Sequence, residues 1–121
     1  MARILIVDDS PAQMYAIRQI IEVDGHEVLS ADSGKSGLET AIKTRPDVIL
    51  MDIVMPDMNG YQVTRKLRSD ETTKAIPVIF VSTKDNEFDR KWGMRQGAVA
   101  YITKPVNSKE LRFAVKNALA G

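Results

Sequence analysis

Short apolar runs alternate with longer segments whose apolar residues recur every three or four positions, and this alternation determines the fold class. The first, third and fourth runs are continuous and aliphatic, as in strands covered on both faces of a parallel sheet. The second run is more polar. We therefore expect strands at residues 4–7, 27–31, 48–51, 76–81 and 98–102.

Capping and turn residues mark where the intervening helices begin. Asp9 or Ser10 precedes Pro11, which is favoured at the first helical position. Similar signals precede the other helical patterns: Asp32 and Ser33, the turn at 56–60, Asp85, and Asn107 or Ser108. Five strand–helix units with right-handed crossovers favour an α/β, flavodoxin-like (βα)5 three-layer sandwich with the parallel strand order 2-1-3-4-5.

The spacing of apolar residues also predicts which helix faces are buried. The second helix should bury Leu38, Ala41 and Ile42, and Thr64 should narrow the apolar face of the third helix. The last helix has a longer stripe, formed by Leu111, Ala114, Val115, Ala118 and Leu119.

Length and composition limit the alternatives. The chain has 121 residues, 17 basic and 16 acidic side chains, a net charge of +1 and no cysteine. One domain of ordinary size is expected, without disulfides or thiolate metal sites. Nucleic-acid binding is not expected at this charge, nor is membrane insertion, because no apolar run approaches ~20 residues. The N-terminus reaches paired acids too early for a signal peptide, so we expect a cytoplasmic protein.

Charged or hydroxyl side chains lie just beyond the ends of four of the predicted strands. Asp8 and Asp9 follow the first strand, Asp52 the third, Ser82 the fourth and Lys104 the fifth. The carboxyl ends of parallel strands share one sheet edge, so these groups should meet there. Ionised carboxylates repel each other at short range, and a hard cation with oxygen ligands, Mg²⁺, would relieve that repulsion. One carboxylate could then act as a nucleophile toward phosphorus.

Each residue alone has an ordinary interpretation. Asp8 and Asp9 could cap a helix, Asp52 could be a surface acid, and Lys104 a solvated charge. A phosphatase of the haloacid dehalogenase type also uses a strand-end aspartate, but it needs a second acid where this chain has Val54. A flavodoxin would need a Gly- and Ser/Thr-rich first loop, which is acidic here.

Four motifs carry a family resemblance: ILIVDDS at 4–10, DVILMDIVMPDMNG at 47–60, PVIFVST at 77–83 and GAVAYITKP at 97–105. Over its whole length the chain resembles the receiver domain of two-component response regulators, the CheY-like family. The resemblance implies a single receiver domain over 1–121 with no output domain. It also implies a phosphoacceptor signalling domain rather than an enzyme. Such a domain catalyses only its own phosphotransfer and dephosphorylation.

The resemblance also implies roles for individual residues. Asp52 would be the phosphoacceptor, and Ser82 and Tyr101 would form the switch. Lys104 would contact the phosphoryl group, and its bond to Pro105 is expected to be cis. Mg²⁺ would be bound by Asp8, Asp9, Asp52 and the backbone carbonyl of Val54.

The partners implied are a histidine kinase and a downstream protein that contacts the fourth helix, fifth strand and fifth helix. The chain would be a monomer or a phosphorylation-dependent dimer. Within the family it looks most like the PilH-type regulators of type IV pilus systems, which control twitching motility through a chemotaxis-like pathway. Whether such a protein signals or acts as a phosphate sink for a sister regulator stays open.

Two single-copy residues outside the motifs carry weaker expectations. Trp92, the only tryptophan, is expected to be partly exposed and to contact a partner. His26, the only histidine, begins a polar strand without a second ligand in view and is expected to be a surface residue.

Overall fold

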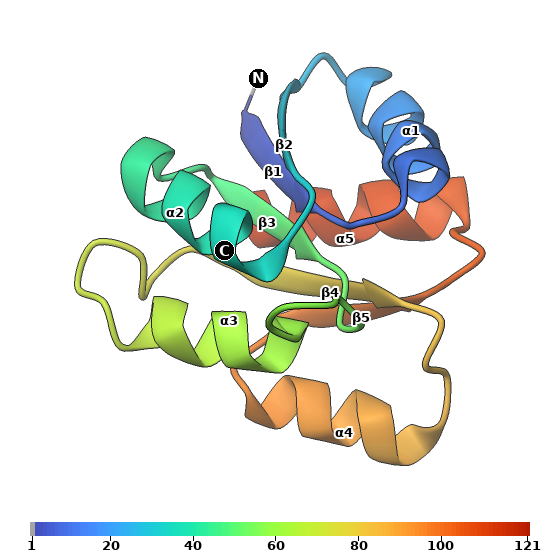
Figure 1. The fold of residues 1–121 in the computed structure, drawn as a ribbon. Helices are drawn as coiled ribbons and strands as arrows, with labels where there is room; N and C mark the ends of the chain where they lie inside the picture. Colours follow the sequence, from blue (N-terminus) through green and yellow to red (C-terminus); the bar gives the residue numbers. More distant parts are fainter. Residues whose placement is uncertain (1) are drawn as a thin grey trace.

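The computed structural model describes residues 2–121 as alternating strands and helices (Figure 1). In chain order these are β1 (Arg3–Val7), α1 (Pro11–Glu22), β2 (Glu27–Ala31), α2 (Gly34–Thr44), β3 (Val48–Met51), α3 (Gly60–Arg68), β4 (Val78–Ser82), α4 (Glu87–Arg95), β5 (Ala100–Thr103) and α5 (Ser108–Ala120). The strands form one parallel sheet in the order β2-β1-β3-β4-β5, which confirms the predicted fold class and strand order.

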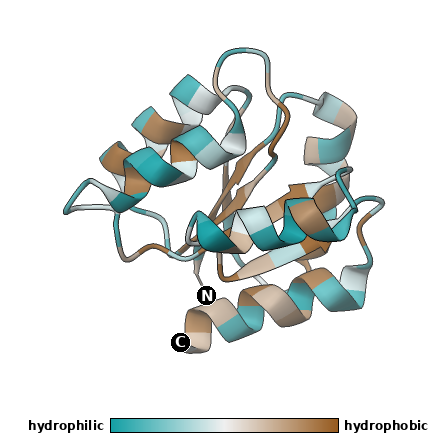
Figure 2. Cartoon of the chain, turned by 90° about the horizontal axis from the view of Figure 1, so that it is seen from below, coloured by the Kyte–Doolittle hydropathy of each residue, from teal (hydrophilic) through white to brown (hydrophobic). Residues whose placement is uncertain are grey.

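The sheet separates two hydrophobic cores. Successive side chains of a strand point to opposite faces, so Leu5 and Val7 enter one core while Ile4 and Ile6 enter the other. Helices α2, α3 and α4 cover the first core, and helices α1 and α5 cover the second. Figure 2 shows the strands as hydrophobic and the helices as bands of hydrophilic and hydrophobic residues. Each helix therefore presents only one side to the sheet.

Three predicted helix positions differ from the structure. Ile42 and Leu119 lie near the C-terminal ends of α2 and α5, and their side chains are 42% and 38% exposed. Thr64 is fully buried, and its hydroxyl donates a hydrogen bond to the Gly60 carbonyl at 2.8 Å. The buried face of α3 is therefore wider than predicted, because this threonine satisfies its polar group within the helix.

Strand β4 begins at Val78 rather than at Ile76. Pro77 has no N–H to donate to the ladder, although its carbonyl accepts a hydrogen bond from the Ile49 N–H at 3.0 Å. Ser10, Ser33 and Asn107 are the N-caps of α1, α2 and α5. Of the helices described in 2–121, none has the length and apolar character that a membrane span requires.

Candidate functional site

Three aspartates meet at the carboxyl edge of the sheet. Asp8 and Asp9 directly follow β1, and Asp52 directly follows β3. One carboxylate oxygen from each lies within 4.8 Å of the others. Asp8 and Asp52 are buried, at 3% and 8% exposure, whereas Asp9 is exposed. The arrangement therefore has two fixed, buried acids and one acid that faces solvent.

Lys104 contributes a cation to the acidic cluster. Its backbone N–H donates to the Ser82 carbonyl at 2.8 Å, which aligns the ends of β5 and β4. Its ammonium donates to Asp8 Oδ2 at 2.7 Å and lies 3.8 Å from Asp52 Oδ1. The peptide bond to Pro105 is cis, as expected. One buried ammonium therefore faces a cluster of three carboxylates.

The charge of Asp52 is poorly compensated. The pKa of its carboxyl is raised to about 6, chiefly by burial and in smaller part by the nearby charges of Asp8 and Asp9. The Lys104 ammonium and a hydrogen bond from the Ile53 N–H, at 2.8 Å, oppose this rise in pKa. A second positive charge would favour the ionised form of Asp52.

The donor set fits a hard divalent cation. All the side-chain ligands offered here are carboxylate oxygens, which Mg²⁺ prefers, and the cluster carries more negative than positive charge. The exposed Asp9 leaves one side of the cluster open to solvent, and Mg²⁺ usually retains several waters. Val54 lies two residues beyond Asp52 in an exposed part of the loop, and a role for its carbonyl stays a prediction.

The loop after Asp52 is held at two points. At its end, the Gly60 N–H donates to the Ile53 carbonyl at 2.8 Å, and a side chain at Gly60 would collide with the Asp52 carbonyl. In its middle, the Asp57 carboxylate accepts hydrogen bonds from the N–H groups of Gly34 and Lys35, at 3.0 and 2.9 Å. These bonds hold the pKa of Asp57 below its usual range.

The role of Asp57 was missed in the sequence, where it was interpreted only as a turn residue. It lies 23 residues from Gly34, and no local pattern links the two positions. Only the strand order places the loop after β3 beside the first turn of α2.

Ser82 and Tyr101 lie on the neighbouring strands β4 and β5, and both bond to the backbone of Lys84. Ser82 is fully buried at the end of β4, and its hydroxyl accepts a hydrogen bond from the Lys84 N–H at 3.2 Å. The Tyr101 hydroxyl donates to the Lys84 carbonyl at 2.6 Å. Burial raises the pKa of Tyr101 to about 12, so the phenol stays protonated. The Ser82 hydroxyl and the Tyr101 hydroxyl therefore both bond to the backbone of the same loop residue, Lys84.

Trp92 is partly exposed, as predicted, with 39% of its surface accessible. It stacks parallel to the exposed Phe88, with ring centroids 6.5 Å apart, and its edge also meets Tyr61. His26 is a half-buried surface residue that lines a pocket, and its Nδ1 accepts a hydrogen bond from the Ala2 N–H at 3.1 Å.

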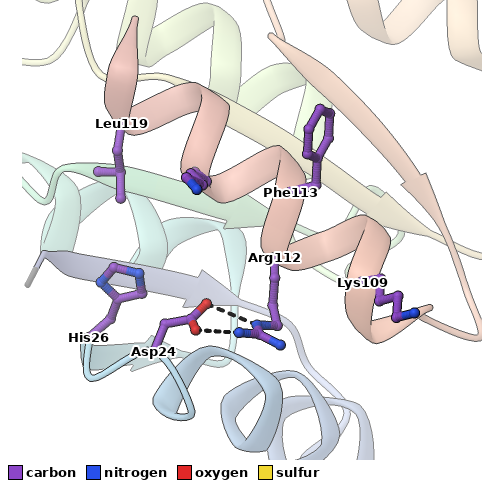
Figure 3. A pocket seen from close by; sticks show the side chains of 7 residues that line it. Asp24, His26, Lys109, Arg112, Phe113 and Leu119 are labelled. Carbon is purple, nitrogen blue, oxygen red and sulfur yellow. Dashed lines mark hydrogen bonds and ion pairs between the residues drawn. The ribbon is translucent and has the colours of Figure 1, made fainter.

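A second concave region lies away from the acidic cluster, between α5 and the turn that precedes β2 (Figure 3). It has a volume of about 460 Å³ and shares no residue with the cluster. It is lined by Asp24, His26, Lys109, Arg112, Phe113, Lys116 and Leu119. Arg112 reaches across it to Asp24 with two hydrogen bonds, at 2.6 and 3.0 Å.

Comparison with known proteins identifies relatives over the full chain. A model of the response regulator receiver domain matches residues 4–116. The chain is 54% identical over 121 residues to Protein PilH of Pseudomonas aeruginosa, and the match covers all of both chains. It is 38% identical over 116 residues to the response regulator PleD of Caulobacter vibrioides, covering 96% of this chain and 26% of that protein.

Solved structures show the same fold. The chemotaxis protein CheY4 of Vibrio cholerae matches with a TM-score of 0.90 and 30% identity, covering 98% of this chain and 99% of that one. The receiver domain of a sensor histidine kinase from Pseudomonas aeruginosa, solved with a magnesium ion in its active-site cleft, matches with a TM-score of 0.92 and 28% identity over 99% and 98% of the two chains. This chain belongs to the response regulator receiver domain family and has the CheY-like fold.

Proposed function

We propose that Asp52 accepts a phosphoryl group from a phosphohistidine of a histidine kinase. The observation that carries this proposal is the buried Asp52 carboxylate, held beside Asp8, Asp9 and the Lys104 ammonium. In the reaction an Asp52 oxygen attacks phosphorus and the P–N bond to the kinase imidazole breaks. The products are an acyl phosphate on Asp52 and a free histidine, which takes up a proton.

Residues of this chain hold the groups that the transfer needs. Asp8, Asp9, Asp52 and the Val54 carbonyl would hold Mg²⁺, which supplies positive charge to the phosphoryl oxygens when bound. Lys104 exchanges part of its contact with Asp8 for the phosphoryl group, because an ammonium has three donors and this one already lies between the two acids. The Ser82 hydroxyl donates a hydrogen bond to another phosphoryl oxygen.

Phosphorylation is read out through Ser82 and Tyr101. The new acceptor oxygens attract the Ser82 hydroxyl away from Lys84, and the room that this leaves stabilises the Tyr101 ring in the buried position that it already occupies. Met94 of α4, Val99 just before β5 and Phe113 of α5 are 46%, 50% and 66% exposed. These apolar side chains support the proposal that a partner protein reads the switch on this surface.

The resemblance to PilH-type regulators supports a role in type IV pilus control. A chemotaxis-like histidine kinase of that system is the proposed phosphoryl donor. Incubation with candidate kinases and radiolabelled ATP tests this choice, since transfer to the cognate protein should be much faster than transfer to unrelated receivers. Equal rates with every kinase would argue against a specific pilus role.

The acceptor itself can be tested without a kinase. Incubation with acetyl phosphate and Mg²⁺ should add the mass of one phosphoryl group, as measured by intact-protein mass spectrometry. The adduct should be absent in Asp52→Asn and retained in Asp85→Asn, which changes an exposed acid outside the cluster. An adduct that persists in Asp52→Asn would overturn the proposal, and so would an adduct that is absent from the wild-type protein.

A further inference from the structure

Arg90 of α4 reaches across to β5 and contacts it at three points. Its Nη2 donates a hydrogen bond to Thr103 Oγ1 at 2.5 Å. Its Nη1 donates to the Tyr101 carbonyl at 3.4 Å. Its guanidinium carbon also lies over the Tyr101 ring, 5.3 Å from the ring centroid. One side chain therefore contacts both the backbone and the ring of the residue that the proposed switch uses.

The other surroundings of Tyr101 complete a closed site for the ring. Phe80 meets it edge-to-face with centroids 6.2 Å apart, and Gly93 allows α4 to approach, because a side chain there would lie 3.1 Å from the ring. The hydroxyl is bonded to the Lys84 carbonyl, and only 7% of the residue is exposed. Arg90 and Lys84 are the exposed members of this set, and Arg90 covers the ring from the solvent side.

We propose that Arg90 is a positioning residue that holds the Tyr101 ring in its buried position and so biases the switch toward the phosphorylated conformation before any phosphoryl group arrives. The proposal rests on the proposed role of Tyr101 as the readout of Asp52. It adds a determinant on α4 whose side chain touches neither the phosphoryl site nor its metal ligands.

The physical argument is a difference in contacts between two states. When the ring is buried, the guanidinium meets both Thr103 and the face of the aromatic ring. When the ring turns toward solvent into another rotamer, the contact with Thr103 can persist but the cation–π contact is lost. Arg90 therefore favours the buried ring, and a ligand or side chain shifts an equilibrium only through such a differential contact.

Arginine suits this position better than lysine would. A planar guanidinium can stack on a ring while its N–H groups donate along the ring plane, whereas an ammonium is a compact point charge. Arg90→Lys should therefore keep the charge and part of the attraction to the ring, but not both hydrogen bonds to β5.

Linkage predicts the functional effect. If the phosphorylated site favours the buried ring, then a change that weakens the buried ring weakens binding of a phosphoryl mimic by at most the same factor, and by less where the buried ring is already the more populated state. Loss of a cation–π contact at an exposed site corresponds to a change of about two- to fivefold in an equilibrium constant. Arg90→Ala should raise the half-saturating concentration of beryllium trifluoride, in the presence of Mg²⁺, by up to that factor.

The experiment uses fluorotyrosine-labelled protein and ¹⁹F NMR. The chain has three tyrosines, so Tyr101→Phe identifies the resonance of Tyr101. In Arg90→Ala, without mimic, this resonance should move toward the position of a solvent-exposed tyrosine, and Arg90→Lys should restore part of the shift. The matched control is Lys91→Ala, which removes the neighbouring cation of α4, whose ion pair is with Glu87. It should leave the Tyr101 resonance and mimic binding unchanged.

The Tyr61 resonance separates a specific effect from general loosening of α4. The Tyr61 hydroxyl bonds to the Asp89 carbonyl of α4, so displacement of the helix would change both resonances. An Arg90→Ala protein with an unchanged Tyr101 resonance, or one in which Tyr61 shifts equally, overturns the inference. If Arg90→Ala does not fold, Arg90→Lys decides the question by the same readings. Failure of the wild-type protein to form an Asp52 adduct would overturn the proposed function instead. The two failures are distinguishable because the resonances recorded without Mg²⁺ and mimic test the Arg90–Tyr101 contact by itself.

Discussion

Asp52 is held as a negative charge where burial opposes ionisation. Its carboxylate lies beside two other acids, and Lys104 gives its shorter contact to Asp8 rather than to Asp52. Because the negative charge of Asp52 is only partly balanced by Lys104, a further positive charge beside it is favourable. The same arrangement makes the site a source of instability when no cation is bound.

Asp52→Asn should stabilise the metal-free protein at neutral pH. The substitution keeps the shape of the side chain and removes one of three repelling charges. Because the pKa of Asp52 is raised from 3.8 to about 6, the gain in unfolding free energy should be at most about 3 kcal/mol. Urea denaturation in EDTA measures it, with Asp85→Asn as the control.

Mg²⁺ provides the second arm of this test. Addition of Mg²⁺ should raise the stability of the wild-type protein more than that of Asp52→Asn, since the variant offers one carboxylate fewer. A metal-free Asp52→Asn protein that is less stable than the wild type would contradict the expectation, and so would equal gains from Mg²⁺.

At the scale of single elements, the N-terminus of α2 is held by hydrogen bonds to one residue next to the helix and to one distant residue. The Ser33 hydroxyl accepts a hydrogen bond from the Ser36 N–H at 3.0 Å, and Asp57 accepts two from the first turn of the helix. The N-cap was predictable because Ser33 immediately precedes the helix. The contribution of Asp57 was not, because hydrogen bonds between distant segments depend on the assembled fold.

Asp57→Ala should weaken the attachment of α2 to the loop after β3 and lower the thermal midpoint. Asp57→Asn should lower it less, since an amide oxygen still accepts one hydrogen bond but carries no charge for the helix N-terminus. For comparison, Ser33→Ala should cost about 1 kcal/mol as an ordinary cap substitution.

Hydrogen exchange shows where the effect of Asp57 lies. In Asp57→Ala, the amides of Gly34 and Lys35 should exchange faster than in the wild-type protein, because they lose their acceptors. Unchanged exchange at both amides would show that the Asp57 carboxylate does not hold this turn.

Burial was predicted well for apolar residues in the middle of a helix face, and poorly for residues near helix ends and for a buried threonine. Periodicity placed Ala41, Leu111 and Val115 in the core, as the structure confirms. It failed at Ile42 and Leu119, because exposure near a helix end depends on how far the neighbouring element extends. It failed at Thr64 because the pattern treats a hydroxyl as polar even where the helix itself satisfies it.

For the whole molecule, the strand order and the meeting of residues at one sheet edge were predictable. Parallel strands with right-handed crossovers leave few topologies, and their carboxyl ends must share an edge. Side-chain geometry at that edge was not predictable: neither the pairing of Lys104 with Asp8 nor the closure of Tyr101 by Arg90 follows from sequence spacing. These contacts depend on side-chain rotamers, which the pattern of apolar and polar residues does not specify.

One long-range ion pair joins the two helices that cover the second core, α5 and the end of α1. Asp24 follows α1, and Arg112 lies on α5, 88 residues away, with two hydrogen bonds between them (Figure 3). The hydrogen bond from Arg112 is the largest cause that lowers the pKa of Asp24. Both groups are partly exposed, so the pair should contribute modestly and be weakened by salt.

The pair should make stability depend on pH in a specific direction. Since the folded-state pKa of Asp24 is lowered, its contribution is present above the ordinary aspartate pKa, about 3.9, and is lost as the pH falls through the lower folded value. The wild-type protein should therefore be more stable than Asp24→Asn at pH 7, and the difference should shrink toward pH 3 or below. Thermal melts across this range measure the difference. A difference that is constant with pH would show that the charge of Asp24 does not matter.

The division of the interior into two cores has a practical consequence for sensor design. Tyr101, Phe80 and Met51 all pack in the core under α2, α3 and α4, whereas α1 packs in the other core, beyond the sheet. A fluorophore attached to α1, for example at the exposed Tyr15, would lie on the side of the molecule that the switch residues do not enter. An environment-sensitive dye on α4 would lie on the side that they do. Under the proposed readout, a donor on α1 and an acceptor on α4 would compare the face of the sheet that holds Tyr101 with the opposite face.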